Sequence, residues 1–115
     1  MNVVLVGAGE VGFNAARMLS DEGNDVVLID DDEALVVRAT EQLDALVMHG
    51  NGASPKVLRE AGVEKAGLMV AATGSDEANI IACLAAKAQG AERTVARIHN
   101  PDYYDPLEPF IQETL

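Results

Sequence analysis

The sequence predicts a single α/β domain built around a doubly wound sheet of parallel strands. Short, uniformly apolar runs alternate with segments of helical character, which is typical of strands covered on both faces and joined by helical crossovers. The first run is followed at once by three glycines in the pattern G-x-G-x-x-G, and the second run ends in an acidic residue. This is the order of a Rossmann-like fold, for which we expect the strand order 3-2-1-4-5 within one domain, residues 1–115.

The first strand is predicted at residues 3–6 (VVLV), and the glycine pattern follows it directly. Gly7 can adopt the backbone angles of a tight turn from strand to helix. Gly9 lacks the Cβ that would hold a pyrophosphate away, and Gly12 lets the helix pack close to the strand. The N–H groups of the first helical turn would then face the phosphates of a dinucleotide. The candidate binding residues are therefore Gly7, Ala8, Gly9, Glu10, Val11 and Gly12. The alternative is that the glycines only form a tight turn.

A helix follows the glycines, and a second strand follows the helix. The apolar face of the helix is predicted to comprise Val11, Ala15, Met18 and Leu19. A glycine at position 23 ends the helix, and residues 26–29 (VVLI) form the second strand. This strand ends in Asp30, eighteen residues after Gly12. In doubly wound folds a carboxylate at this place hydrogen-bonds the ribose hydroxyls of the adenosine half.

The acidic residues after the second strand bear on the choice of nucleotide. Residues 30–33 read DDDE, and such a cluster would repel the 2′-phosphate of NADP, which an arginine usually receives. NAD, or an adenine nucleotide without that phosphate, is therefore favoured. The three acids after Asp30 are interpreted as the solvated start of a helix, since carboxylates are favoured in a first turn.

The remaining elements are predicted from apolar runs, capping residues and the need for crossovers. They are expected, in order, at residues 33–42 (helix), 45–49 (strand), 56–61 (helix capped by Ser54), 68–72 (strand), from Ser75 (helix), and 94–98 (strand). The helix from Ser75 is expected to bury Ile80, Leu84 and Ala88. Residues 107–115 are interpreted as the start of a helix without a sixth strand. The edge of the fifth strand would then be exposed to pairing with another copy, which predicts a homo-oligomer.

The loop after the third strand is a second candidate part of the site. It reads HGNGASP and would lie beside the crevice at the carboxyl ends of the strands. Asn51 could hydrogen-bond an adenine edge, while Gly52 and Ala53 would let the ring approach the backbone. An ordinary capped loop is an equally supported interpretation.

Residues after the fourth and fifth strands would line the other side of the crevice. Thr73 and Gly74 follow the fourth strand and would lie near a second ribose or a nicotinamide. Arg97 lies at the carboxyl end of the fifth strand, where it could reach the phosphates of the ligand. A surface ion pair with one of the many acids is the alternative for Arg97.

Composition limits the classes of function. The formal net charge of -11 opposes binding to nucleic acid or to anionic lipid, and no apolar stretch is long enough to span a membrane. A strand begins directly at the N-terminus and leaves no room for a signal peptide, so a cytosolic location is expected. The single cysteine, Cys83, excludes an internal disulfide and is interpreted as a buried structural thiol.

Five stretches together resemble a known family. VGAGEVG, VVLIDDD, HGNGASPKVLREAGV, VAATGSDEANIIAC and VARIHNPDYY are similar to the N-terminal nucleotide-binding domain of TrkA-type potassium-uptake regulators, also called the KTN or RCK domain. The resemblance runs from Met1 to about Tyr104. It implies a regulatory subunit, not an enzyme, that assembles on the inner face of a potassium-translocating membrane protein. It also implies binding of NAD or NADH, or of ADP or ATP, with occupancy converted into a change of ring geometry.

The resemblance also implies roles for individual residues. It places the pyrophosphate at residues 7–12, the adenosine ribose at Asp30, the adenine at Gly52 and Ala53, the other half of the ligand at Thr73 and Gly74, and the phosphates at Arg97. Many relatives have aspartate where this chain has Asn51, which alters the adenine contact without removing it. Some relatives that bind ATP have arginine where this chain has Glu10, which would repel a γ-phosphate.

A detached cofactor-binding domain of an NAD-dependent dehydrogenase is the alternative function. A dehydrogenase needs a substrate domain and a general acid or base beside the nicotinamide. The only histidines are His49 and His99, both near predicted strand ends, and the chain has no room for a second domain. Both histidines are therefore interpreted as loop residues.

Overall fold

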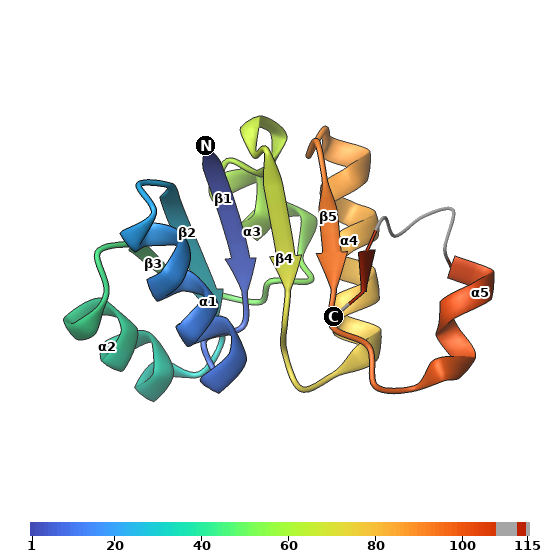
Figure 1. Cartoon of the computed structure of the whole chain (residues 1–115), viewed down its shortest axis with the longest axis horizontal. Coiled ribbons are helices and arrows are strands. Elements are labelled where there is room, and N and C mark those ends of the chain that lie inside the picture. The colour runs from blue at the N-terminus through green and yellow to red at the C-terminus, as the bar shows by residue number, and fades with distance from the viewer. Residues whose placement is uncertain (108–112, 115) are drawn as a thin grey trace.

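The computed structural model describes residues 1–107, 113 and 114, and its strands form one parallel sheet in the order β3-β2-β1-β4-β5-β6 (Figure 1). The predicted order 3-2-1-4-5 is therefore confirmed. The elements are β1 (Asn2–Val6), α1 (Glu10–Asp21), β2 (Asp25–Asp30), α2 (Glu33–Gln42), β3 (Leu46–His49), α3 (Pro55–Glu60), a 3-10 turn η1 (Val63–Lys65), β4 (Leu68–Ala71), α4 (Asp76–Gln89), β5 (Thr94–Ala96), a second 3-10 turn η2 (Pro101–Tyr103), α5 (Tyr104–Leu107) and β6 (Glu113–Thr114).

The sheet is covered on both faces, as its uniformly apolar strands predict. Alternate residues of β1 enter different cores: Val4 packs with α3 and α4 residues such as Leu58, while Val3 packs with α1 and α2 residues such as Phe13. In Figure 1 the helices α1 and α2 lie in front of the sheet and α3 and α4 lie behind it. Because these strands run parallel, the carboxyl ends of β1, β2, β4 and β5 lie together at the lower edge in this view.

The buried face of α1 differs from the predicted one. Val11 and Met18, expected in the core, are 39% and 56% exposed. The helix instead buries Gly12, Phe13 and Ala16. The cause is the close approach of Gly12 to the turn at Gly7, which orients the helix by its glycine face and not by its most apolar stripe.

The buried face of α4 also differs, for a reason of hydrogen bonding. Ile80 is buried as predicted, but Leu84 is 38% exposed and Ala88 is exposed. The sheet-facing side carries Asn79 and Cys83 instead. Burial raises the pKa of the Cys83 thiol to about 12, in keeping with its interpretation as a structural residue.

The end of the chain corrects one prediction. Residues 107–115 are predicted to begin a helix without a sixth strand, but Glu113–Thr114 form β6; α5 covers Tyr104–Leu107, and residues 108–112 lie outside the described part. Val95 and Ala96 of β5 pair with β6. A two-residue strand carries too few side chains for a recognisable period. Because β6 covers the edge of β5 at these positions, that edge does not support the expected homo-oligomer.

Asp76 holds the segment that leaves β5. It is 9% exposed in the first turn of α4, and its carboxylate accepts hydrogen bonds from the backbone N–H groups of His99 and Asn100, both at 2.8 Å. The His99 ring nitrogen Nδ1 lies 3.2 Å from the same carboxylate. These backbone donors, first that of His99 and then that of Asn100, lower the pKa of Asp76 below its ordinary value of 3.8, against the opposing effect of burial.

This geometry predicts a stability effect confined to acid pH. Since the pKa of Asp76 is lower in the folded protein than in the unfolded chain, its stabilisation is present above about pH 4 and is lost as the pH falls through the folded value. Asp76→Asn should therefore be less stable than wild type at pH 5, and the difference in urea midpoint should narrow at pH 3. A difference of equal size at both pH values would contradict the role given to this carboxylate.

Candidate functional site

A cleft of about 430 Å³ opens at the carboxyl ends of β1, β2, β4 and β5. This volume lies in the range of small-molecule sites. The predicted residues that line it are Gly7, Gly9, Glu10, Val11, Asp30, Asn51, Gly52, Ala53, Thr73, Gly74 and Arg97. Ala8 and Gly12 are not among the lining residues, because both are buried beneath the turn. Segments far apart in the sequence therefore meet at one cleft, as the predicted topology requires.

The three glycines of the first turn differ in what a Cβ atom, if added, would contact. A Cβ on Gly12 would overlap the carbonyl oxygen of Gly7. Gly7 has a φ of +106°, and a Cβ there would lie 2.9 Å from backbone atoms of Ala72. A Cβ on Gly9 would meet nothing within 4 Å among the described residues. The fold itself thus requires glycine at positions 7 and 12, while only a ligand in the cleft would require it at position 9.

The amino end of α1 faces this space without a side-chain cap from the described residues. The side chains of Asp32, Ser54 and Ser75 cap α2, α3 and α4 respectively, the last two as predicted. Gly9 occupies the cap position of α1 and has no side chain to offer. The orphan N–H groups of the first turn of α1 are therefore available to an anion.

On one side of the cleft, Asp30 connects the glycine turn after β1 to the start of α2. Its Oδ2 accepts a hydrogen bond of 2.7 Å from the N–H of Ala8, and its Oδ1 accepts one of 2.8 Å from the N–H of Asp32. The carboxylate thus tethers the glycine turn to the start of α2. A carboxylate has about four lone-pair sites, so two remain for hydroxyl donors of a ligand.

The loop after β3 lies against the floor of the cleft. A Cβ on Gly52 would overlap the Val6 side chain, so this loop depends on glycine to reach its position. Asn51 Oδ1 accepts a hydrogen bond of 2.9 Å from the N–H of Ala53, which leaves its amide donors for a ligand. His49 Nε2 lies 2.9 Å from the carbonyl oxygen of Asp31 and thereby connects this loop to the neighbouring loop after β2.

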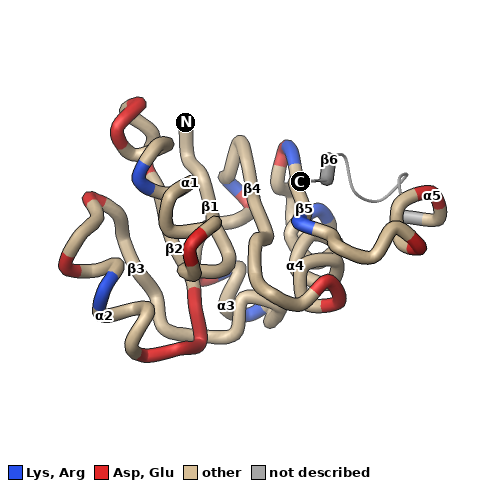
Figure 2. The backbone as a smooth tube through the Cα atoms, turned by 60° about the horizontal axis from the view of Figure 1, so that its bottom comes forward, with Lys and Arg blue, Asp and Glu red and all other residues tan. Residues whose placement is uncertain are grey.

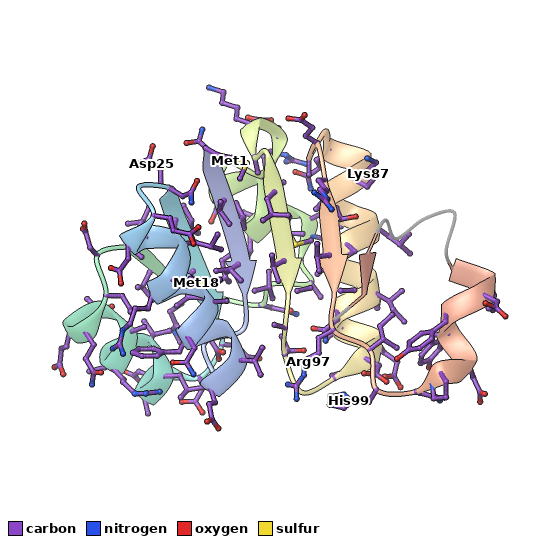
Figure 3. The ribbon with its side chains drawn as sticks, in the orientation of Figure 1. Met1, Met18, Asp25, Lys87, Arg97 and His99 are labelled. Atoms are coloured by element: carbon purple, nitrogen blue, oxygen red, sulfur yellow. The ribbon has the colours of Figure 1, made fainter. Side chains whose placement is uncertain are left out.

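The far side of the cleft carries Thr73, Gly74 and Arg97. Both donors of Thr73, its N–H and its hydroxyl, are used by Asn79 Oδ1 at 2.9 and 2.7 Å, so Thr73 shapes the wall more than it offers donors. Figure 3 shows Arg97 beyond the lower end of β5. Arg97 forms no ion pair with the residues that the structure describes, in contrast to the surface-pair alternative.

The charge around the cleft is mostly negative. The backbone tube in Figure 2 shows a continuous acidic segment between β2 and α2, and Asp31 and Asp32 of this segment line the cleft together with Glu10. Arg97 is the one cation among the lining residues of the described chain. A bound anion would therefore rely on Arg97 and on backbone N–H groups.

The sequence did not single out several residues of the cleft. Val6, Leu35 and Ala78 also line it, but apolar side chains in strands and helices look like ordinary core. Asn79, which does not line the cleft, was also missed. The feature that could have identified Asn79 is a polar side chain on the side of a helix that packs against the sheet.

The described residues contain neither a candidate metal site nor a candidate membrane span. No group of three or more histidine, cysteine or acidic side chains there is placed to hold a metal ion. No helix there combines the length and the apolarity that a membrane crossing requires.

Known proteins resemble this chain over nearly its whole length. A "Trk system potassium uptake protein TrkA homolog" from Methanothermobacter thermautotrophicus is 44% identical over 108 residues, covering 94% of this chain and 50% of that protein. A protein of the same name from Archaeoglobus fulgidus is 43% identical over 113 residues, covering 98% of this chain and 25% of that protein. The chain thus spans half or less of the length of these two relatives.

Solved structures share the fold at lower identity. The TrkA-N domain of inner membrane protein ybaL from Escherichia coli has a TM-score of 0.89 at 20% identity, covering 99% of this chain and 85% of that one. The GsuK channel bound to NAD has a TM-score of 0.85 at 19% identity over 99% of this chain and 21% of that one. The Shewanella denitrificans Kef CTD in its AMP-bound form has a TM-score of 0.82 at 23% identity over 100% of this chain and 70% of that one.

The family-level comparison agrees with the resemblance found in the sequence motifs. The family model described as the TrkA-N domain matches residues 3–112, nearly the whole chain. The two relatives named above are 44% and 43% identical over almost the same length. By this match and these identities, the chain belongs to the TrkA-N domain family.

Proposed function

We propose that this domain binds NAD(H) or an adenine nucleotide and belongs to a regulatory subunit of a potassium uptake system. The observation that carries the proposal is the free space at Gly9, between the uncapped first turn of α1 and the Asp30 carboxylate. The relatives named as potassium uptake proteins support the biological setting. The NAD-bound and AMP-bound neighbours support the class of ligand.

Each part of the ligand has a matching part of the cleft in this proposal. Asp30 accepts hydrogen bonds from the adenosine ribose, while the loop at Gly52 and Ala53 receives the adenine. The backbone N–H groups of the first turn of α1 and the Arg97 side chain hold the phosphates. Thr73 and Gly74 border the other half of a dinucleotide. The expected result is a ligand that bridges both halves of the sheet.

The regulatory step follows from differential affinity. A nucleotide that contacts both halves of the sheet favours the arrangement of neighbouring domains in which those contacts are best, and its effect is limited by that difference. In this proposal the domain works on the cytoplasmic side of the membrane, within a homo-oligomer formed through surfaces other than the edge of β5. Its partner there is a potassium-translocating membrane protein.

The dehydrogenase alternative has no observation in its favour. His49 contacts the backbone of Asp31, and His99 contacts Asp76. Neither histidine lines the cleft. We therefore propose a nucleotide-binding domain without catalytic activity.

A binding comparison tests the class of nucleotide. NADH, NAD and ADP should each bind at least about tenfold, or 1.4 kcal/mol, more tightly than ATP, because Glu10 lies on the cleft near the phosphates and repels a γ-phosphate. NADP should also bind more weakly than NAD, since Asp31 and Asp32 line the ribose side. Calorimetry with each ligand measures both differences.

Glu10→Gln is the matched variant for this comparison. It removes the negative charge and keeps the size of the side chain, so it should narrow the gap between ADP and ATP. ATP binding as tightly as ADP to the wild-type protein would contradict the assigned role of Glu10.

A further inference from the structure

The side chain of Asn79 is completely buried near the start of α4, and it connects two segments of the far side of the cleft, at Thr73 and Arg97. Its Oδ1 accepts hydrogen bonds from the N–H of Thr73 at 2.9 Å and from the Thr73 hydroxyl at 2.7 Å. Its Nδ2 donates to the carbonyl oxygen of Thr73 at 3.1 Å and to that of Arg97 at 2.7 Å. Both donors and both acceptor sites of the amide are therefore used.

These bonds lie just past the end of strand pairing. The register of β4 and β5 ends with Ala71 opposite Ala96, and the N–H of Arg97 then bonds the carbonyl oxygen of Ala71 at 2.8 Å. Beyond this point Asn79 joins the backbones of Thr73 and Arg97. A side chain of α4 thus continues a connection that the sheet no longer makes.

Asn79 belongs to a series of contacts between α4 and the chain of β5. One turn earlier, Asp76 binds the N–H groups of His99 and Asn100. One turn later, the Cys83 thiol lies 3.5 Å from the carbonyl oxygen of Val95. A helix advances about 5.4 Å per turn and a strand about 6.6 Å per two residues, so the two elements stay in step. Of the three side chains, Asn79 is the one that also reaches the β4 loop.

We propose that Asn79 is a positioning residue of the nucleotide site, acting through Thr73 and Arg97. It does not line the cleft, so in this proposal it acts without touching the ligand. It sets the position of the Arg97 backbone relative to the Thr73–Gly74 wall, and hence where the Arg97 guanidinium meets the phosphates. This inference rests on the proposed function, and it adds that the half of the site distant from Asp30 is assembled by one buried amide.

The distinguishing expectation is a change in ligand preference. NADH extends from the adenosine half to the Thr73–Gly74 wall, whereas AMP has one phosphate at the first turn of α1 and lacks the second phosphate and the nicotinamide half that lie toward Arg97 and that wall. Asn79→Ala should therefore lower the affinity for NADH by about tenfold or more and the affinity for AMP by much less. A purely structural role would weaken both ligands together and leave their affinity ratio unchanged.

Cys83→Ala is the matched control. It removes a buried side chain from the same face of α4 with a contact to the same strand, but one turn farther from the cleft. It should lower thermal stability and leave the NADH-to-AMP affinity ratio at the wild-type value. If Asn79→Ala does not fold, Asn79→Leu serves instead, because it keeps the branched shape and fills the buried space while removing the hydrogen bonds to Thr73 and Arg97.

A double-mutant cycle with Arg97→Ala completes the test by calorimetry on the intact chain. If Asn79 acts through Arg97, the loss of NADH affinity in the double variant should be smaller than the sum of the two single losses. Additive losses, or an unchanged NADH-to-AMP ratio in the Asn79 variants, would overturn the positioning role. A wild-type protein that binds neither NADH nor AMP would overturn the proposed function itself, which separates the two failures.

Discussion

Gly12→Ala is expected to destabilise the fold by at least about 3 kcal/mol, whereas Gly9→Ala should stay within about 0.5 kcal/mol of wild type. A Cβ at position 12 overlaps the carbonyl oxygen of Gly7, a backbone atom that cannot move without displacing α1 or β1. A Cβ at position 9 meets nothing within 4 Å, and its φ of -68° suits alanine. Urea unfolding followed by circular dichroism measures both differences.

The same pair of variants separates fold from binding. Gly9→Ala should fold normally but bind NADH at least about tenfold more weakly, because its methyl group fills the space proposed for the diphosphate. Wild-type stability of Gly12→Ala would contradict the packing described for this turn. Wild-type NADH affinity of Gly9→Ala would place the diphosphate somewhere else.

Asp30→Ala is expected to lower the affinity for NADH by about 100-fold, or 2.7 kcal/mol. Two losses combine in this variant: the charged acceptor for the ribose hydroxyls disappears, and the N–H groups of Ala8 and Asp32 lose their partner. The glycine turn is then no longer tethered to the start of α2. Calorimetry with NADH measures the loss of affinity, and urea unfolding measures how much stability is lost with the two backbone hydrogen bonds.

Asp31→Ala is the matched control for charge. Asp31 also lines the cleft and carries the same charge, but Asp30 and not Asp31 receives the two backbone bonds. Removing Asp31 should leave the NADH affinity unchanged or slightly higher, since one negative charge on the cleft is gone. An equal loss of affinity in both variants would mean that Asp30 acts only through the local electrostatic field.

The fold and residues on both sides of the cleft are predictable because signals in the sequence determine them. Buried parallel strands carry continuous apolar runs, and the spacing from Gly7 to Asp30 is that of one strand-helix-strand unit. Positions at the carboxyl ends of neighbouring strands follow from topology alone. This is why residues as distant as Asp30 and Arg97 were assigned to the same crevice, and both line it.

What was missed depends on contacts that no local pattern encodes. The buried face of α1 is set by the close approach of Gly12 to Gly7. The buried polar side chains of α4, Asp76 and Asn79, hydrogen-bond backbone groups that lie some twenty residues away in the sequence or across a loop. The apolar stripes of α1 and α4 therefore predict only part of the face that each helix buries. The strand β6 is too short to give a pattern.

The position of a bound dinucleotide in the cleft is the central claim, and a structure determined with NADH tests that position directly. We expect the diphosphate against the N–H groups that follow Gly9, the adenosine ribose hydroxyls within hydrogen-bond distance of the Asp30 carboxylate, and the nicotinamide half toward Thr73 and Gly74. A cleft left empty at saturating NADH, or a ligand bound with its ribose away from Asp30, would contradict the account.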